Sequence, residues 1–537
     1  MITVNNLGLQ YGKRVLFDEV NLKFTHGNCY GVIGANGAGK STFLKMLSGD
    51  IQPTRGSVSI EPGNRMAVLK QNHLEYDEFS VLDTVIMGHK HMFDIMQTKN
   101  AIYMNPDATE AEGMKAAELE IEFGEIGGWT AESDAAELLS KMGIKEELHS
   151  MQMKELRGPQ KVKVLLAQSL FGDPDILLLD EPTNDLDAMT VTWLADFLAD
   201  FKNTVIVVSH DRYFLDMVCT HVVDIDYGSM SIFTGNYTFW YETSKIMARQ
   251  LANRNKKIES KRNELQEFIS RFSANASKSR QATSRKKALE KLNLEEIRPS
   301  TRKYPFINFT PERAPGDQIL KVENLSKTDA NGNVLFQNVS FTMNKGDKIA
   351  VICKESSVLT TFFNVIAGKE KADSGVIEFG QTITFDYLPN DNAKFFEGEN
   401  DTDLINWLRQ FSEEKDEQFI RGFLGRMLFS GEEVHKTTGV LSGGEKVRCM
   451  FAKMMLSHPN FLILDDPTNH LDLESIITLN DAMAEFKGNM LFTSHDHQMM
   501  QTVSNRIVEL LPDGNADALM SFEEYLEKKD AKAMEMA

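Results

Sequence analysis

Residues 34–41 of the chain read GANGAGKS and fit the pattern G-x-x-x-x-G-K-[ST]. They follow a strand-like stretch, CYGVI, and precede a helix-like stretch, STFLKML, which is the context this motif requires. Its glycines let backbone amides face the phosphates of a nucleotide, the lysine reaches the β- and γ-phosphates, and the serine hydroxyl ligates Mg²⁺. The sequence therefore predicts a phosphate-binding loop, with nucleotide contacts from Gly34, Asn36, Gly37, Ala38, Gly39, Lys40, Ser41 and Thr42.

Two adjacent carboxylates follow an apolar run further along the chain. Asp180 ends the run ILLLD, which predicts a position at the C-terminal edge of a strand, where a carboxylate can hold the shell of a Mg²⁺ ion. Glu181 comes next and can orient or deprotonate an attacking water. The pair alone is weak evidence for a hydrolytic site. The residues around and after it, DEPTND, and the segment IVVSHD at 206–211 strengthen that interpretation. We expect hydrolysis of a nucleoside triphosphate, with Lys40 and Glu181 as catalytic residues.

The elements that must position these groups occur twice. VLFDEVNLKFTHGNCYGVIG (15–34) matches VLFQNVSFTMNKGDKIAVIC (334–353), and ILLLDEPTNDLD (176–187) matches LILDDPTNHLD (462–472). In each half, apolar runs alternate with helical patterns, which is typical of an α/β fold with a mainly parallel, helix-covered sheet. The offset between the copies shrinks along the chain, so the first half carries extra residues, which we assign to an acidic helical insertion at about 84–136. A tolerated surface excursion is the alternative interpretation.

Length and composition agree with two soluble domains. A chain of 537 residues is too long for one core, and 42% hydrophobic with 25% charged residues is ordinary for globular proteins. No apolar run approaches the roughly 20 residues needed to span a bilayer, and the N-terminal residues show no secretory signal. Four scattered cysteines fit burial as small apolar residues in a reducing compartment. We therefore expect a cytoplasmic protein with no membrane segment.

The net charge of −20 hides a segment of opposite sign between the halves. Residues 245–303 contain 17 Lys and Arg against 6 Glu, a local charge of +11, so the remainder carries −31. Leu251, Ile258, Leu265 and Phe272 recur every seven residues and predict a coiled-coil seam on a helix from about 244 to 272, roughly 43 Å long. A small, basic stretch and a second apolar periodicity follow, so the simplest geometry is an antiparallel helical hairpin with a basic tip. A solvated spacer is the alternative.

With these motifs, both halves of the chain resemble the ATP-binding cassette superfamily, over roughly 240 residues each. The resemblance implies two P-loop cassette domains of α/β fold, with ATP and Mg²⁺ as ligands. It also implies that Tyr11 stacks on adenine, that Gln71 touches metal and water, that His210 is the switch histidine and that Asp187 lies in the D-loop. For His210 alone, a satisfied core histidine is the alternative interpretation.

In this superfamily ATP is held between the phosphate loop of one cassette and the signature segment, LSGGQ, of the other. Each site must therefore be judged from the phosphate loop of one half together with the signature of the other half. The second half has a nearly intact signature, LSGGEK at 441–446. The resemblance implies that this segment closes on ATP held at Lys40 and gives one complete site. Its nucleotide-binding residues are Ser442, Gly443, Gly444 and Glu445.

The opposite site has lost most of its parts. In VICKESSVLTTFF (351–363), Cys353, Ser356, Val358 and Leu359 stand where the first half has Gly34, Gly37, Gly39 and Lys40, although Thr360 survives as a hydroxyl. Asp466 replaces the glutamate, no aromatic matches Tyr11, and the counterpart of Gln71 falls near Pro389. The partner signature, LRGPQ, carries Arg157 and Pro159. We predict one competent site and a degenerate one in which Asp465 and His495 serve packing.

Tandem cassettes without membrane segments, joined by a charged helical hairpin, resemble the ABC-F subfamily of soluble ATPases that act on ribosomes. The most specific piece is FISRFSANASKSRQATSR at 268–285, whereas the damaged second loop departs from the pattern. The resemblance implies a first cassette at 1–240, a hairpin linker at 241–315 and a second, degenerate cassette at 316–537. The insertion at 84–136 would be an arm that reaches toward a ribosomal stalk.

The same resemblance implies partners and a mode of action. The protein would dock near the ribosomal exit (E) site, with its linker contacting P-site tRNA and the peptidyl-transferase region, and modulate translation as a monomer without binding DNA. The short hairpin tip favours a housekeeping factor over antibiotic protection. Alternatives are the ATPase subunit of a membrane transporter and a non-hydrolysing ATP-sensing adaptor. The RNA-binding residues would be Arg271, Lys278, Arg280, Arg285, Lys286 and Lys287.

Overall fold

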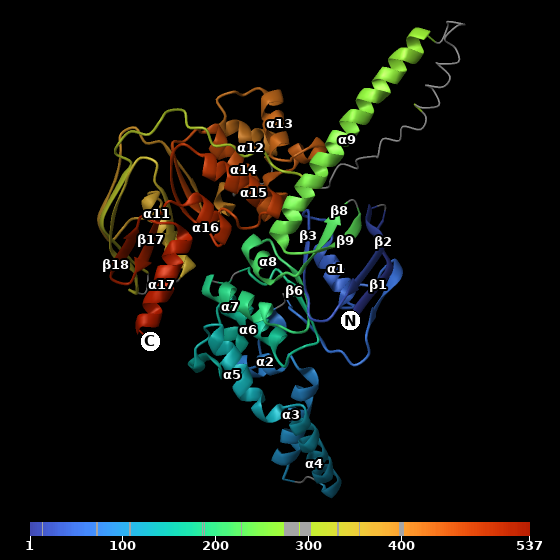
Figure 1. Cartoon of the computed structure of the whole chain (residues 1–537). Helices are drawn as coiled ribbons and strands as arrows, with labels where there is room; N and C mark the ends of the chain where they lie inside the picture. Colours follow the sequence, from blue (N-terminus) through green and yellow to red (C-terminus); the bar gives the residue numbers. More distant parts are fainter. Residues whose placement is uncertain are drawn as a thin grey trace.

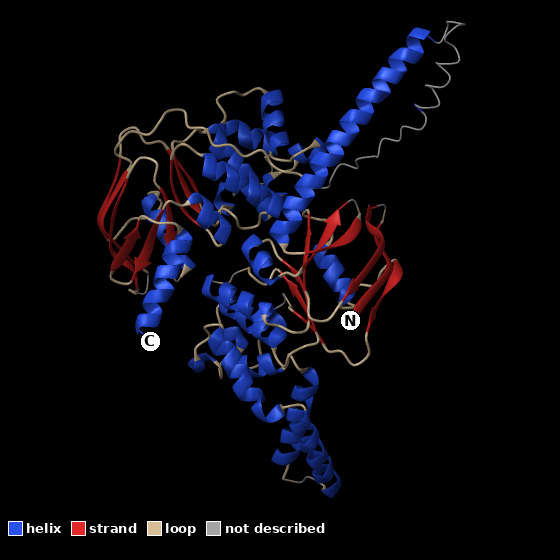
Figure 2. Ribbon diagram, viewed as in Figure 1, coloured by secondary structure: helices blue, strands red, loops and turns tan. Residues whose placement is uncertain are grey.

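The computed structural model contains two sheet-and-helix bodies in sequence order, with a long helix rising from the first (Figures 1 and 2). We call residues 1–240 the first half and residues 302–536 the second half. The structure describes residues 1–12, 14–70, 73–106, 109–184, 186, 188–226, 228–272, 289, 302–329, 332–353, 355–396 and 402–536.

Each half is built on a six-stranded sheet and a smaller antiparallel sheet of three strands. In the first half the large sheet has the order β5-β6-β7-β3-β8-β9, parallel except for β9, and the small sheet has the order β2-β1-β4. The strands are β1 (Ile2–Tyr11), β2 (Arg14–Phe24), β3 (Cys29–Gly34), β4 (Arg55–Ile60), β5 (Met66–Val68), β6 (Ile176–Asp180), β7 (Thr204–Val208), β8 (His221–Asp226) and β9 (Ser229–Thr234).

The second half repeats this arrangement as β14-β15-β16-β12-β17-β18 and β11-β10-β13. Its central strands, like those of the first half, are continuous apolar runs because both faces of the sheet are buried, one against helices and the other against one helix and the small sheet. The strands are β10 (Leu320–Thr328), β11 (Val334–Met343), β12 (Lys348–Ile352), β13 (Ser374–Phe379), β14 (Phe385–Leu388), β15 (Phe461–Asp465), β16 (Asn489–Thr493), β17 (Arg506–Leu511) and β18 (Gly514–Ala518).

The helices also correspond between halves, apart from one hairpin. The first half has α1 (Lys40–Leu47), α2 (Val81–Ile86), α3 (Lys90–Met104), α4 (Glu110–Glu125), α5 (Ala131–Lys141), α6 (Gly158–Leu170), α7 (Ala188–Ala199) and α8 (Arg212–Val218). The second half has α11 (Ser356–Ile366), α12 (Leu404–Phe411), α13 (Glu417–Arg426), α14 (Gly443–Leu456), α15 (Leu473–Glu485), α16 (His497–Val503) and α17 (Phe522–Met536).

The hairpin of α3 and α4 projects away from the first half at the lower end of Figure 1. Helix α2 packs on α5 and α6 much as α12 packs on α13 and α14, so α2 and α5 have counterparts whereas α3 and α4 have none. We therefore assign the extra residues of the first half to this hairpin, inside the expected range of 84–136. At its root, Lys99 lies over the rings of Phe123 and Trp129, at 4.7 and 5.2 Å from the ring centres.

The linker begins as a continuation of the first half. Helix α9 (Tyr237–Phe272) starts about seven residues before the expected position and ends where the seven-residue periodicity predicts. Its first turns belong to the core, because Tyr237 and Trp240 are 4% and 5% exposed and pack with the apolar cluster of the first half. Apart from residue 289, the stretch 273–301 lies outside the described residues, and so does the expected return helix of the hairpin.

The chain re-enters the described part at Arg302 and crosses the second half before its first strand. The amide of Phe306 donates to the carbonyl of Arg426 at 2.8 Å, and Ile307 and Phe309 are buried in the second half's core. The end of the expected linker is thus packed on the second half. No helix among the described residues carries an apolar stretch long enough to cross a membrane.

Candidate functional site

The phosphate loop (residues 34–41) connects β3 to α1 at the carboxyl edge of the large sheet. Gly37 and Gly39 have φ values of 76° and 101°, a conformation that suits glycine and turns the backbone amides outward. The Lys40 ammonium donates to the carbonyl of Gly34 at 2.8 Å and its residue is 8% exposed. Burial lowers the pKa of Lys40, against the opposing effect of neighbouring carboxylates. The loop therefore folds around its own lysine.

Ser41 and Asp180 form a pair of oxygen ligands beside the loop. The Ser41 hydroxyl donates to the Asp180 carboxylate, which ends β6 as expected, and burial raises the pKa of Asp180. A hydroxyl and a carboxylate oxygen held side by side next to a phosphate site match what Mg²⁺ prefers. The residues present therefore fit a Mg²⁺ ion that also contacts the phosphates.

Glu181 is held in an unusual backbone conformation against the switch histidine. Its φ is 52°, and its amide donates to the carbonyl of Val208 at 2.8 Å, which fixes it at the edge of β7. One carboxylate oxygen accepts from the His210 amide at 3.2 Å, and the other lies 3.2 Å from His210 Nε2. Positive φ at a non-glycine residue is uncommon and often accompanies function.

Burial sets the protonation states of this pair. It raises the pKa of Glu181 to about 7, an effect that Lys40 opposes and Asp180 reinforces, and it lowers the pKa of His210 to about 3. The imidazole is therefore neutral at pH 7, while Glu181 exchanges a proton near neutrality. A group with such a pKa is suited to accept a proton from an attacking water.

Some expected site residues lie outside what the structure describes. Gln71 and Asp187 are outside the described residues, and Tyr11 ends β1 with its side chain not described. The structure does bring Lys40, Ser41, Asp180, Glu181 and His210 to one edge of the sheet. These five therefore stand together as the sequence predicts.

The signature of the second half is a capped helix start. Ser442 is the N-cap of α14 and accepts from the Glu445 amide at 3.4 Å, while Glu445 accepts from the Ser442 amide at 2.8 Å. A Cβ on Gly443 would lie 2.9 Å from the His470 ring, and one on Gly444 would lie 2.6 Å from the His470 carbonyl oxygen. The two glycines therefore allow residue 470 to pack closely against the start of this helix.

The segment that faces the phosphate loop in this conformation is the start of α15. Asp472 and Glu474 of the second half both act on the charge of Lys40, and Leu473 packs into the first half's apolar cluster. Among the described residues, no hydrogen bond or ion pair joins the signature (residues 441–445) to the first half. The halves are therefore in contact at this site, without engagement of the signature.

The segments that follow the two switch histidines touch each other. Arg212 Nη2 lies 3.5 Å from Asp496 Oδ1, and the ring of Tyr213 stacks on that of His497. The sequence analysis missed this contact. The matching segments SHDRYF and SHDHQM indicate equivalent positions, but equivalence alone does not predict that the two copies meet.

The second loop (residues 353–360) is filled with apolar side chains. Val358 and Leu359 are 5% and 6% exposed within the second half's apolar cluster. Thr360 still donates to Asp465, and burial raises the pKa of Asp465 to about 6. Asp466 keeps the positive φ, 51°, and lies 3.5 Å from His495 Nε2. The carboxylates at the strand edge are thus kept, whereas the position of the loop lysine is taken by Leu359, which packs in the apolar core.

The sheet register corrects the expected counterpart of Gln71. Val68 pairs with Leu178, two residues before Asp180, and Tyr387 pairs with Ile463, two residues before Asp465. Counting three residues onward from each reaches Gln71 and Asn390. The counterpart is therefore Asn390, not Pro389, and it does carry an amide side chain. Its Oδ1 accepts from Asn469 Nδ2 at 3.2 Å, and its backbone amide donates to Asp465 at 3.4 Å.

Comparison with known proteins matches both halves. A family model described as ABC transporter matches residues 17–184 and 336–469, and another with the same description matches residues 223–309. The chain is 58% identical over 533 residues to "Uncharacterized ABC transporter ATP-binding protein YkpA" of Bacillus subtilis (strain 168), covering 99% of this chain and 98% of that protein. It is 44% identical over 531 residues to "Probable ATP-binding protein YbiT" of Escherichia coli O157:H7, covering 98% and 99%.

A more distant relative and a solved structure complete the comparison. The "ABC transporter F family member 5" of Arabidopsis thaliana is 28% identical over 550 residues, covering 100% of this chain and 78% of that protein. The archaeal ribosome recycling factor aABCE1, solved in complex with the ribosomal stalk protein aP1, superposes with a TM-score of 0.63 at 18% identity, covering 98% of this chain and 92% of that one. This similarity establishes a shared tandem fold.

Proposed function

Since the chain belongs to the ABC-F group of the ATP-binding cassette family, we propose that it hydrolyses ATP at one composite site and acts on ribosomes. In this proposal Lys40 leaves the Gly34 carbonyl and binds the β- and γ-phosphates, while Ser442 and the signature amides close on the γ-phosphate. Glu181, oriented by His210, accepts the proton of the attacking water. Mg²⁺, held by Ser41, Asp180 and Gln71, would neutralise charge on the phosphates.

One observation carries the assignment of a single competent site. Lys40 and Leu359 occupy equivalent positions after equivalent strands, and only the first is a cation that can reach phosphate. Leu359 is part of an apolar cluster, so rearrangement of the loop for a nucleotide would expose core surface. The second site would then bind nucleotide poorly and not hydrolyse it.

The linker supports the choice of a ribosomal partner. Along α9 the cations Lys245, Arg249, Arg254, Lys256, Lys257, Lys261 and Arg262 are all exposed, on a protein whose net charge is −20. Exposed cations on a projecting helix can neutralise RNA phosphates that acidic cassettes would repel. A structural neighbour is the archaeal ABCE1 bound to a ribosome with Pelota, with a TM-score of 0.58. Contact with the exit site, P-site tRNA and rRNA, and action in the cytoplasm, belong to the proposal.

Ribosome sedimentation tests the proposal. Glu181→Gln removes the proton acceptor while keeping the shape of the side chain, so with ATP the protein should accumulate in the closed state. We expect it to sediment with ribosomes through sucrose in the presence of ATP. The matched control is the double variant Glu181→Gln/Lys40→Ala, which should stay in the supernatant because it cannot hold the phosphates. Recovery of the single variant with membranes, and not with ribosomes, would favour the transporter-subunit alternative.

A further inference from the structure

Arg302, the residue at which the chain re-enters the described part after the linker, joins both halves. Its Nη2 lies 2.5 Å from Asp224 Oδ1 and its Nη1 lies 3.5 Å from Asp226 Oδ2, both on β8 of the first half. Its Nε lies 2.9 Å from Glu474 Oε1 on α15 of the second half. The guanidinium also lies over the Trp240 ring, 4.8 Å from its centre. One side chain, 10% exposed, therefore ties the linker end to both cassettes.

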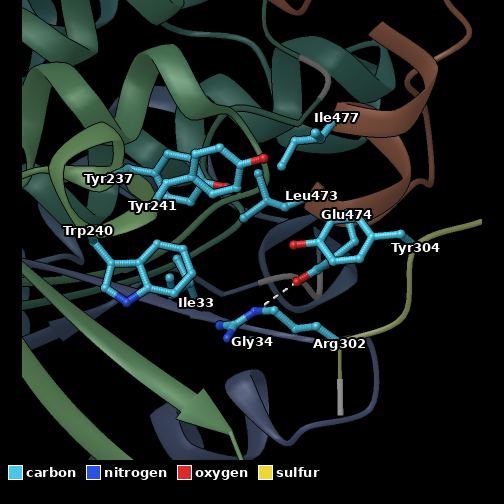
Figure 3. A pocket seen from close by; sticks show the side chains of 10 residues that line it. All are labelled: Ile33, Gly34, Tyr237, Trp240, Tyr241, Arg302, Tyr304, Leu473, Glu474 and Ile477. Carbon is cyan, nitrogen blue, oxygen red and sulfur yellow. Dashed lines mark ion pairs between the residues drawn. The ribbon is translucent and has the colours of Figure 1, made fainter. Parts of the chain in front are cut away.

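This junction lies directly behind the phosphate loop. Ile225, which separates the two β8 carboxylates, pairs with Gly34 in the sheet. Gly34 and Glu474 line the same small cavity, which has room for about one water molecule and is closed by Tyr237, Trp240, Tyr241 and Tyr304 (Figure 3). Lys40 bonds the Gly34 carbonyl at 2.8 Å. Glu474 therefore lines a cavity together with Gly34, the loop residue whose carbonyl accepts a hydrogen bond from Lys40.

The Glu474 carboxylate is buried, and among the described residues 316–536 no cation forms an ion pair with it. The side chain is 5% exposed, and Oε2 accepts no hydrogen bond from another described residue. A second carboxylate, Asp472, lies two residues earlier and acts in the same sense on Lys40. A buried anion this close to a triphosphate site opposes ATP binding, unless a cation cancels its charge. Arg302 is the cation in contact with it.

We propose that Arg302 is a positioning residue for ATP: it holds Glu474 at the back of the phosphate loop, offsets part of its charge, and so makes ATP affinity depend on the linker end. Arg302 lies at the C-terminal end of the linker. Displacement of this part of the chain would therefore break its contact with Glu474, leave the carboxylate without its cation and weaken ATP binding. By linkage, ATP binding would favour the linker position in which the contact is made. The inference rests on the proposed ATP site. It adds that the position of the linker end affects ATP affinity at that site through Arg302 and Glu474.

The test measures the dissociation constant of a fluorescent ATP analogue with Mg²⁺ for the full-length chain. Arg302→Gln should weaken binding by about tenfold, within the usual range of coupling between sites. Glu474→Gln should tighten binding by about threefold or more, because it removes the anion and leaves the cation. The double variant should bind about as tightly as Glu474→Gln alone, because Arg302 then has no Glu474 charge to offset, and Arg302→Lys should lie between wild type and Arg302→Gln.

Several results would overturn the inference. Weaker ATP binding by Glu474→Gln alone would do so, and this variant answers the question even if Arg302→Gln fails to fold. A double variant that binds about tenfold more weakly than Glu474→Gln alone, as additive effects would give, would show that Arg302 does not act on ATP through Glu474. Ribosomes should alter the dissociation constant of the wild type more than that of the double variant, and an equal change would exclude the linker route. Failure of the wild type itself to bind the analogue above the level of Lys40→Ala would instead contradict the proposed function.

Discussion

The ring of Tyr213 in the first cassette stacks on the imidazole of His497 in the second, with ring centres 4.0 Å apart and planes 17° from parallel. Tyr213 follows the switch histidine His210 by three residues, and His497 follows its counterpart His495 by two. Beside the stack, Arg212 pairs with Asp496 at 3.5 Å. The segments that follow His210 and His495 are therefore in direct contact across the two cassettes, at a place separate from the linker.

This contact predicts an effect of the degenerate half on hydrolysis. His497→Ala removes the stack, which as an aromatic pair is worth about 0.5–1.5 kcal/mol, and should lower kcat by roughly two- to tenfold. The measurement is steady-state ATPase activity. His435→Ala is the control, because that histidine is exposed and pairs with Asp403 within the second half. Equal activity of the His497 variant and wild type would show that the contact has no catalytic consequence.

A half-buried carboxylate next to this contact predicts a pH dependence of stability. Burial, and then the nearby Asp496, raises the pKa of Asp211 to about 7, against the opposing effects of Arg212 and of the backbone amides it caps. In the unfolded chain the carboxyl ionises near about 3.9. Between these values the folded state holds a proton that the unfolded state has lost, so this group's contribution to stability falls as pH rises from about 4 to 7.

Asp211→Asn isolates that contribution. Asp211 caps α8 by accepting from the Phe214 amide at 3.1 Å, and asparagine caps a helix about as well as aspartate. We expect the difference in melting temperature between wild type and variant to shift in favour of the variant as pH rises from 5 to about 7.5. Parallel melting curves over this range would mean that Asp211 is ionised throughout.

The asymmetry of the two sites predicts unequal effects of substitutions in the first site and in the second. Lys40→Ala should reduce ATPase activity by about 100-fold or more, since its charge acts on the phosphates. Asp466→Ala should change it by less than about threefold, because that residue belongs to a site whose loop is filled by apolar side chains. A large loss from Asp466→Ala would show that the second site takes part in turnover.

Rebuilding the missing cation should not restore the second site. Leu359 is 6% exposed among apolar neighbours, so Leu359→Lys buries an ammonium without a partner and should cost about 2–4 kcal/mol of stability. We expect a lower melting temperature and no gain in the number of nucleotides bound per chain. Leu359→Met is the matched control for volume. A second bound nucleotide in the lysine variant would contradict the account of this loop.

The signature glycines predict a distinctive pattern of rescue. Gly443→Ala would press on the His470 ring, whereas Gly444→Ala would press on the His470 carbonyl oxygen, at 2.9 and 2.6 Å. Both should lower ATPase activity, but His470→Ala should restore only the Gly443 variant, because the carbonyl remains after the ring is removed. Rescue of both variants would show that backbone contact is not the cause.

The sequence correctly predicted which residues of the first half lie together at the carboxyl edge of its sheet, for a physical reason. Gly34, Lys40, Asp180 and Glu181 are close because each follows a parallel strand, and motif spacing reports this directly. The counterpart of Gln71 was expected near Pro389, one residue before Asn390, because its position depends on the pairing of β14 with β15, which the sequence alone does not show.

Two further differences arise from packing, which a single sequence shows poorly. Helix α9 begins at Tyr237, and its first aromatic residues serve the cassette core, so the seven-residue periodicity detects only the part beyond them. The junction at Arg302 joins β8, α9 and α15, three elements far apart in the chain. Its partners could not be named before the two halves were placed against each other.

The rooting of α9 in the first cassette has a mechanical consequence. A helix of 36 residues is about 54 Å long, and its base is clamped by buried Tyr237 and Trp240. A cassette rotation of only about 5° would sweep the far end of such a rod through about 5 Å, close to one helical turn. Any rotation of the first cassette is therefore enlarged at the far end of α9 in proportion to the length of the helix.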